Sequence, residues 1–513
     1  LICGSVYTFE HEENGRIFGY DKVIMLAGGI GYANAADSLK ENPAPGQAIV
    51  VMGGDNYRIG MGGGAVSSVA TGEYGNTIEL NAVQRSNPEM QKRVFNTIRA
   101  LTEMEHNPVV SIHDHGAGGH LNALSELVEQ TGGVIDLDAL PVGDPTLSAR
   151  EIISNESQER MGLIIRKEDL QLLERIATRE RAPVYIAGET TQDHRLVFHD
   201  RRDDSRPIDL TLSDFFGKAP RTVITDHSRP VLYSQLTFSR ELLDDYLQKV
   251  LRLEAVACKD WLTNKVDRAV SGKIAMQQTC GPIQLPLNNA GIVALDYTGS
   301  AGVATSIGHA SAAALIDPQA GSRLAIAEAL TNLIWAPLTH GLKGVSLSAN
   351  WMWPCKNDGE DARLYQAVKA ASDFANELGI NIPTGKDSLS MTQKYPDGKM
   401  VFAPGTVIIS AAAEVSDVQK AIRPVLSDEP GTELIYIGFS RDNFKLGGSS
   451  FGQVVNALGN EVPTVKDSAW VVRVFDTVQE MIRNGLILSG HDVSAGGLIT
   501  TLLEMCLDRK SVV

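Results

Sequence analysis

Cysteines, aromatic residues and long apolar runs are all scarce in this sequence. The five cysteines are scattered over 513 residues and form no Cys-x-x-Cys pair, which is typical of a reducing compartment and argues against a zinc ribbon. No apolar run approaches the roughly 18 residues that a membrane span needs, and no signal peptide is recognisable. We therefore expect a cytoplasmic protein that does not contact membranes.

Basic charge is scarce as well. The 46 lysines and arginines are outnumbered by 62 aspartates and glutamates, which gives a formal net charge of −16 at pH 7. Because no basic stripe offsets this charge, nucleic acid is not an expected partner. Glycine, by contrast, is abundant: 48 glycines with 43% hydrophobic and 6% aromatic residues indicate an α/β protein rich in tight turns, long enough for three or four domains.

One motif occurs twice. Residues 113–119 and 491–497 both read His-Asp-x-x-Ala-Gly-Gly, and each follows an apolar, strand-like run and leads into an amphipathic helical pattern. At the start of a helix, the glycine amides attract an anion, and the aspartate suits a hard cation. Two copies of such a motif predict an internal repeat.

Three further pairs of segments extend the repeat. The first residues of the paired segments differ by 384, 385 and 387 positions, and those of the motif by 378: 23–29 with 407–413, 45–50 with 430–435, 55–60 with 442–447, and 113–119 with 491–497. The pairs keep the same order, and the offset changes in loops, where insertions are tolerated. We expect both copies of the repeated domain, called B in the next paragraph, to begin with a Pro-Gly turn, a buried strand and a glycine-rich bend.

The repeat divides the chain into domains of two kinds, A and B. It predicts the tail of a first A domain (residues 1–43), a first B domain (44–215), a linker with a helix (216–251), a second A domain (252–427) and the front part of a second B domain (428–513). Since the sequence opens at a leucine rather than a methionine, and stops soon after a helical pattern, we expect the parent protein to continue at both ends.

Several stretches carry candidate chemistry. Residues 58–68 are dense in glycine, so their amides suit phosphate, but they match neither a P-loop nor a dinucleotide fingerprint, and a tight packing turn is the alternative. The polar run 155–160 is either a substrate-contact loop or a solvated turn. Residues 382–388 place a lysine and an aspartate after a glycine in an expected loop, with a simple turn as the alternative.

Glu328 and Asn332 are four residues apart in a helical pattern, so they share one face of the helix. Two oxygen ligands one turn apart suit magnesium, and a polar helix edge is the alternative. His113 and His115 lack a third nitrogen or sulfur ligand, so a zinc site is not expected. No Ser/His/Asp or Cys/His arrangement can be assembled, so the catalytic residues stay unassigned.

Together, these stretches resemble the synthetase portion of the formylglycinamide ribonucleotide amidotransferase (phosphoribosylformylglycinamidine synthase) family, in its large single-chain type. The resemblance runs over essentially the whole chain, and its most specific motifs are Asn-Glu-Ser-Gln-Glu-Arg and Ser-Ala-Asn-Trp. The matching segments are 60–68, 83–90, 113–119, 155–160, 328–332, 347–351, 385–388 and 491–492.

The resemblance implies an α/β fold of two tandem units like aminoimidazole ribonucleotide synthetase, in which the A domains share a barrel-like β core and the B domains are α/β sheets with helices. It also implies a monomeric pseudo-dimer. The implied reaction is a step of de novo purine biosynthesis: ATP phosphorylates the amide oxygen of formylglycinamide ribonucleotide, and ammonia from a glutaminase domain displaces the phosphate to give formylglycinamidine ribonucleotide.

The resemblance also implies an auxiliary site for Mg²⁺ and ATP or ADP. The family's magnesium positions fall on Asn289, Glu328, Asn332 and Asp492, and its nucleotide contacts fall on Asn288 and Ser494. The family often has Asp at the position of Asn289, and an amide oxygen ligates magnesium without contributing a charge, so we expect a weaker site. The family's catalytic nucleotide site and its glutaminase triad would lie outside residues 1–513, so this chain alone is not expected to complete the reaction.

There are two alternatives, of which the second belongs to another functional class. One is another ATP-dependent synthetase of the same superfold, of the selenophosphate or thiamine-phosphate type, but those enzymes are single units that dimerise, whereas this chain is duplicated covalently. The other is a non-catalytic nucleotide-binding scaffold, which the uncharged Asn289 favours.

Overall fold

The computed structural model of the chain describes residues 3–507, except 32, 85, 219, 264–267, 269–271 and 428. The chain divides into two compact units: residues 28–223 form one, and residues 1–27 with 224–513 form the other. The five predicted domain ranges stay a prediction. No helix of the described residues is both long and apolar enough to cross a membrane, and all five cysteines are free.

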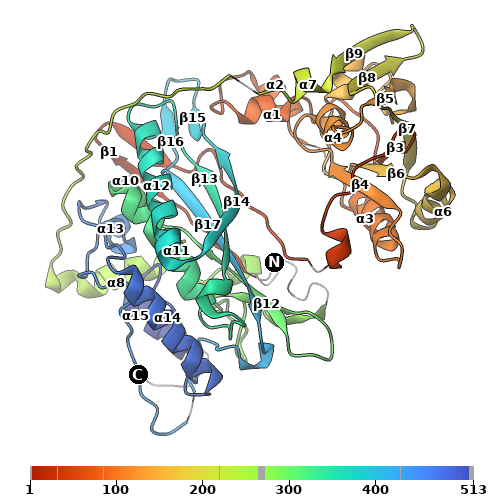
Figure 1. Cartoon of the computed structure of the whole chain (residues 1–513). Helices are drawn as coiled ribbons and strands as arrows, with labels where there is room; N and C mark the ends of the chain where they lie inside the picture. Colours follow the sequence, from red (N-terminus) through yellow and green to blue (C-terminus); the bar gives the residue numbers. More distant parts are fainter. Residues whose placement is uncertain are drawn as a thin grey trace. The chain divides into compact units, whose positions relative to one another are not determined.

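The unit of residues 28–223 is built on a mixed sheet of seven strands (Figure 1). Neighbouring strands are antiparallel except β5 and β8, which are parallel. In sheet order the strands are β4 (Val109–Asp114), β6 (Met161–Ile165), β3 (Ala48–Met52), β7 (Val184–Thr190), β5 (Gly133–Asp136), β8 (Arg195–Asp200) and β9 (Ser205–Thr211).

Helices cover both faces of this sheet. Its helices are α1 (Gly63–Ser67), α2 (Asn76–Asn81), α3 (Pro88–Thr102), α4 (Gly119–Leu127), α5 (Ala149–Ile153), α6 (Leu170–Glu180) and α7 (Leu212–Phe215), with short 3-10 turns at Ala35–Asp37, Leu137–Ala139 and Lys167–Asp169. The core on one face includes residues of α4 and α5, and the core on the other face includes residues of α3 and α6.

The strand β3 is the centre of this unit. All five of its residues are buried, and successive side chains point to opposite faces. Ile49 and Val51 therefore pack into the core with α4 and α5, while Val50 and Met52 pack into the core with α3 and α6. The prediction of a buried strand after the Pro-Gly turn is confirmed for this copy of the repeat.

The other unit holds a six-stranded sheet. Neighbours are antiparallel except β13 and β14, which are parallel. In sheet order the strands are β10 (Ile274–Met276), β11 (Gly291–Ala294), β12 (Gly302–Gly308), β17 (Thr406–Val415), β13 (Ser346–Met352) and β14 (Asn381–Ser388). Residues 382–388 thus lie in a strand, and the expectation of a loop or turn there is wrong because they pair with β13 along the sheet edge.

A second, four-stranded sheet of this unit pairs strands near the start of the chain with strands that lie between β14 and β17 in the sequence. Its order is β1 (Glu10–Glu13), β2 (Arg16–Gly19), β16 (Met400–Phe402) and β15 (Thr392–Lys394). The strands β2 and β16 are parallel, with Ile17 opposite Val401 and Phe18 opposite Phe402. Segments that the repeat assigns to two different A domains therefore share one sheet. The predicted α/β class is confirmed, with open sheets among the described strands.

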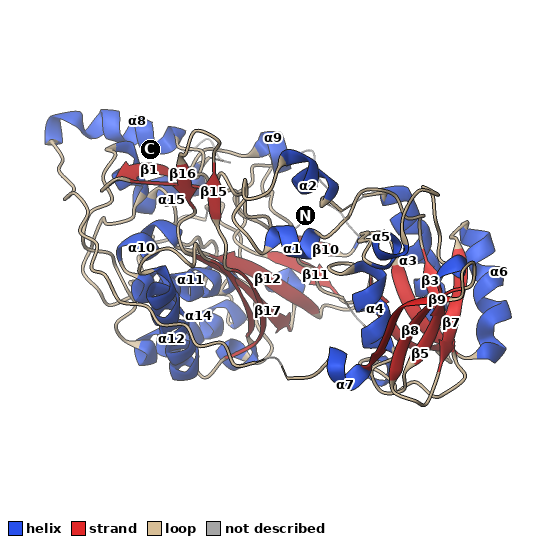
Figure 2. Ribbon diagram, turned by 90° about the horizontal axis from the view of Figure 1, so that it is seen from above, coloured by secondary structure: helices blue, strands red, loops and turns tan. Residues whose placement is uncertain are grey.

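Helices α11 and α12 lie side by side against one face of the six-stranded sheet, and α14 packs against α12 (Figure 2). The helices of this unit are α8 (Leu243–Arg252), α9 (Asp260–Thr263), α10 (Ser311–Ile316), α11 (Pro318–Leu333), α12 (Glu360–Leu378), α13 (Ser450–Val454), α14 (Ser468–Arg483) and α15 (Gly497–Cys506), with 3-10 turns η4 (Arg240–Leu242), η6 (Gly341–Gly344) and η7 (Val418–Lys420). The side chain of Asp317 caps α11, accepting hydrogen bonds from the amides of Gln319 and Ala320, and Pro318 suits the first helical position.

The second copy of the buried strand does not form. Residues 433–437, the counterpart of β3, are in no strand, and Leu434 and Ile435 are 65% and 66% exposed. The prediction of a buried strand is wrong here because β3 depends on hydrogen bonds to β6 and β7. Residues 433–437 have no neighbouring strand among the described residues, and a strand without partners is not stable.

We expect Phe374→Ala to lower the free energy of unfolding of this unit by about 3–5 kcal/mol, because the lost ring leaves a cavity in the core. Phe374 lies on α12 and is fully buried. Tyr365, on the same helix and 70% exposed, is the matched control, and Tyr365→Ala should change the value by less than about 0.5 kcal/mol. Urea denaturation measures both, and equal effects would contradict this packing.

Candidate functional site

The four predicted magnesium positions come together at one place in the larger unit. Glu328 and Asn332 project from α11, Asn289 lies in the loop before β11, and Asp492 lies in the turn before α15. The amide nitrogen of Asn289 donates to Asn332 Oδ1 at 3.1 Å and also to Asp492 Oδ1. Positions 203 residues apart in the chain are therefore direct neighbours.

The cluster draws on several elements. The spacing of Glu328 and Asn332 places both on one face of α11, and Asn332 Nδ2 donates to the carbonyl of Ile307 in β12 at 3.0 Å. The backbone carbonyl of Asp492 accepts a hydrogen bond from Thr501 in α15 at 3.0 Å. The cluster is thus fixed by helix α11, strand β12 and helix α15.

The electrostatics of the cluster favour the binding of a cation. Burial and then the charge of Asp492 raise the pKa of Glu328 well above its ordinary value. Asp492 is 6% exposed, and its Oδ2 accepts no hydrogen bond from any residue that the structure describes. The charges of Asp492 and the partly buried Glu328 repel each other, and a divalent cation between them would remove the repulsion.

The donor set suits magnesium better than zinc. Among the described residues, no three His, Cys, Asp or Glu side chains are arranged to hold a metal ion. A cation here would depend on the amide oxygens of Asn289 and Asn332, which are hard ligands of the kind that Mg²⁺ accepts. The Asn289 amide presents its nitrogen to Asp492, so it must turn over before its oxygen can bind a cation.

The two predicted nucleotide contacts have different settings. Asn288 Nδ2 donates to the carbonyls of Gln277 and Thr279 at 2.6 and 3.2 Å, which fixes the preceding loop. Its Oδ1 is buried and has no hydrogen-bond partner among the described residues. Ser494 is exposed in the turn before α15, and its carbonyl accepts from the amide of Gly497 at 3.0 Å.

The start of α15 is shaped by glycine. Gly496 has φ +89° and Gly497 has φ +74°, a left-handed conformation that glycine adopts without steric cost. The amide of Gly496 donates to Ser450 Oγ at 3.1 Å, and that of Gly497 to the carbonyl of Ser494. No side chain caps the helix, and the helix dipole favours negative charge at its start. The sequence motif therefore places a carboxylate and a helix N-terminus next to each other.

The first copy of the motif, in the unit of residues 28–223, is arranged differently. Asp114 Oδ1 accepts a hydrogen bond from the amide of Gly116 at 2.8 Å. The nearby carboxylate of Glu156 accepts from the amides of Gly64 and Gly118, each at 3.1 Å. An internal carboxylate thus occupies the amides at the start of both α1 and α4, which supports the packing-turn alternative for this part of the glycine-rich stretch.

The polar run 155–160 is a buried element, and the alternative of a solvated turn is wrong. Five of its six residues are at most 2% exposed, and Gln158 is the exposed one. Arg160 donates to the carbonyls of Gly54 and Asn155 at 3.0 and 3.1 Å. These polar groups are buried because they satisfy backbone carbonyls of the glycine-rich bends.

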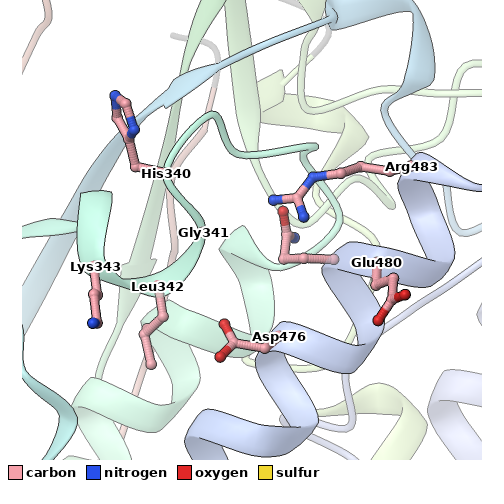
Figure 3. Close-up of a pocket in the computed structure, with 8 residues that line it drawn as sticks. His340, Gly341, Leu342, Lys343, Asp476, Glu480 and Arg483 are labelled. Atoms are coloured by element: carbon pink, nitrogen blue, oxygen red, sulfur yellow. The ribbon is translucent and has the colours of Figure 1, made fainter.

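A hollow of about 540 Å³ lies at a different place in the larger unit, between η6 and α14. Figure 3 shows Asp476, Glu480 and Arg483 on α14 facing this hollow, with His340 and Lys343 on its other side. None of the predicted site residues lines it, so it is not part of the candidate site.

Two family models match the chain. The model of the FGAR-AT PurM_N-like domain matches residues 258–414, and the model of the AIR synthase related protein, C-terminal domain, matches residues 44–201 and again 429–513. One model that matches twice confirms the internal repeat.

Curated relatives match almost the whole chain. Phosphoribosylformylglycinamidine synthase of Homo sapiens is 40% identical over 503 residues, which are 94% of this chain and 37% of that protein. The probable synthase of Caenorhabditis elegans is 39% identical, covering 98% of this chain and 39% of that protein. This chain belongs to the phosphoribosylformylglycinamidine synthase family. It spans a little over a third of the length of these relatives.

Solved structures with the same fold come from Thermotoga maritima. PurL of that organism complexed with FGAR is similar with a TM-score of 0.57 at 20% identity, covering 75% of this chain and 57% of that chain. PurL complexed with ATP is similar with a TM-score of 0.52, also at 20% identity. At this level of identity the likeness concerns the fold.

Sequence reasoning missed a further residue of the candidate site. The His491 side chain lies beside Asp492, with its Nδ1 3.1 Å from Asp492 Oδ1. Its Nε2 lies 3.0 Å from Glu504 Oε2 in α15. Burial lowers the pKa of His491, but the hydrogen bonds to the two carboxylates outweigh it and raise this pKa to about 9. The repeat contained the signal, because Glu504 lies 378 residues after Glu126, the same offset as the motif (504 − 126).

The buried histidines of the first copy predict a loss of stability in acid. Burial, and then the charge of Arg160, lower the pKa of His115 and of His120 well below 6.5. Above pH 6.5 their contribution is fully present. Below it, the unfolded chain takes up protons that the folded one does not, and stability falls by up to about 1.4 kcal/mol per pH unit for each histidine.

Urea denaturation of the unit of residues 28–223, at pH 7.5 and at pH 5.5, measures this loss. His115→Gln is expected to show a smaller difference between the two pH values than the wild type. The exposed His106 gives the control His106→Gln, which should keep the wild-type difference. An undiminished difference in His115→Gln would contradict the assignment.

Proposed function

We propose that this chain is part of an ATP-dependent ligase that amidates formylglycinamide ribonucleotide with glutamine-derived ammonia in purine biosynthesis. The synthases of other organisms, 38–40% identical over 94% or more of the chain, support the reaction class. The Thermotoga maritima PurL structures with FGAR and with ATP support these two substrates. The ammonia is proposed to come from a glutaminase domain, and the free cysteines support a cytoplasmic location.

The main observation in favour of a Mg²⁺ and nucleotide site in this chain is Asp492 Oδ2. This oxygen has no hydrogen-bond partner among the described residues and lies among three further oxygen-bearing side chains. We assign Glu328, Asn332, Asp492 and, after its amide turns, Asn289 to Mg²⁺. We assign the positive end of the α15 dipole, together with Asn288 and Ser494, to the phosphates of ATP or ADP. When bound, Mg²⁺ supplies charge neutralisation for those phosphates, and the residues of the chain orient it and exclude water.

A second candidate function is a nucleotide-binding scaffold without catalysis. It is favoured by Asn289, because an uncharged residue at this position lowers the negative charge available to the cation. The two functions make the same prediction for binding but differ in turnover. An amidation assay of the full-length protein, with and without Asp492→Ala, separates them.

Asp492→Ala and Glu328→Ala are each expected to weaken the binding of ADP with Mg²⁺ by more than about tenfold, since even outer-shell partners of a metal are worth roughly 10–100-fold in affinity. Isothermal titration calorimetry on the full chain measures this. Asp476→Ala, which removes a carboxylate that lines the separate hollow beside α14, is the control and should bind as the wild type does. Unchanged binding in both site variants would refute the assignment.

Asn289→Asp is expected to tighten the binding of Mg²⁺ by roughly tenfold, the factor that corresponds to about 1.4 kcal/mol of added Coulomb attraction. The variant restores a negative charge beside Asp492, where Asn289 already makes contact. The same titration, repeated with ADP held constant, measures the change. Weaker binding in Asn289→Asp would show that Asn289 is not a ligand.

A further inference from the structure

Both copies of the repeated motif contain the same histidine–glutamate pair. His491 Nε2 lies 3.0 Å from Glu504 Oε2, and His113 Nε2 lies 2.7 Å from Glu126 Oε2. Each glutamate follows its histidine by 13 residues and lies in the last turn of the helix that follows the motif, α15 or α4. In both copies, the pair connects the histidine that precedes the motif's aspartate to the helix that follows the motif.

The two copies differ in what the other ring nitrogen contacts. His491 Nδ1 lies 3.1 Å from Asp492 Oδ1, a side-chain oxygen. His113 Nδ1 lies 2.7 Å from the backbone carbonyl oxygen of Asp114. Only in the second copy does the anchored imidazole therefore contact the carboxylate itself.

The two carboxylate oxygens of Asp492 differ in their hydrogen-bond partners. Oδ1 accepts a hydrogen bond from Asn289 and lies 3.1 Å from His491 Nδ1, which Asn289 Nδ2 also contacts at 3.2 Å. The buried Oδ2 has no hydrogen-bond partner among the described residues. A carboxylate held through one oxygen cannot rotate freely, so its second oxygen keeps a fixed direction.

We propose that His491, anchored by Glu504, is a positioning residue that fixes the Asp492 carboxylate through Oδ1 and directs Oδ2 to the cation. This inference rests on the proposed Mg²⁺ site, and it concerns the chain's own residues. His491 does not touch the cation but acts through Asp492. The equivalent pair in the first copy has the same anchor without the carboxylate contact, so it serves as an internal comparison.

Binding of Mn²⁺ to the full chain in the presence of ADP, followed by its electron paramagnetic resonance signal, tests the proposal. His491→Ala and Glu504→Ala are expected to lower the affinity for Mn²⁺ by about 10–100-fold, as outer-shell partners of metal ligands do. Glu504→Gln keeps a hydrogen-bond acceptor for the imidazole and should retain most of the affinity. Glu126→Ala removes the equivalent anchor in the first copy and should leave the Asp492 site unchanged.

Thermal unfolding of the same variants without metal separates positioning from a purely structural role. Unchanged Mn²⁺ affinity in His491→Ala, with affinity lost in Asp492→Ala, would overturn the positioning role while the cation site stands. A loss of affinity that follows the melting temperature in every variant, Glu126→Ala included, would overturn it as well. If Asp492→Ala binds Mn²⁺ as the wild type does, the cation site itself is refuted, and the positioning role with it.

Discussion

A single buried side-chain amide joins helix α14 to the turn that follows α11. Gln479 in α14 donates to the carbonyls of Ile334 and Ala336 at 2.6 and 3.0 Å, and it accepts from the amide of Leu338 at 2.8 Å. Buried backbone groups must be paired, and here one side chain pairs three of them. The turn that it closes follows α11, and α14 itself leads towards Asp492.

This tie matters because residues 429–507 contain no strand. A segment without a sheet cannot be placed by strand pairing, so its position depends on what α14 packs against. Phe475 and Val471 of α14 are fully buried in the same core as α11 and α12. That packing, together with the amide of Gln479, holds Asp492 close to Glu328.

The site that results is electrostatically unfavourable without a cation. Burying two carboxylates near one another costs free energy unless a positive charge or hydrogen bonds compensate them. His491 compensates part of this cost through its contacts with Asp492 and Glu504. The first copy of the motif has no such arrangement, because Asp114 turns to the amide of Gly116. Two similar sequences therefore carry two different local charge distributions.

Local spacing allowed part of this to be predicted. The pairing of Glu328 with Asn332 on one helix face and the two copies of the His-Asp-x-x-Ala-Gly-Gly motif are visible in the order of residues alone. The burial of residues 155–160 was not predictable, because their polar side chains are satisfied by carbonyls such as that of Gly54, about a hundred residues away. Residues 382–388 likewise extend as a strand only because β13 is beside them.

The sequence by itself determined the repeat, the α/β class and the ligand types, since these depend on periodicity and on residue chemistry. The family resemblance named the four oxygen-bearing positions of the second copy, but only the tertiary structure decided that their side chains meet. That decision depends on contacts such as Asn289 with Asp492, between residues that are distant in the chain. It also decided that residues 433–437 stay exposed while their counterpart β3 is buried, because a strand is stable only where other strands supply its hydrogen bonds.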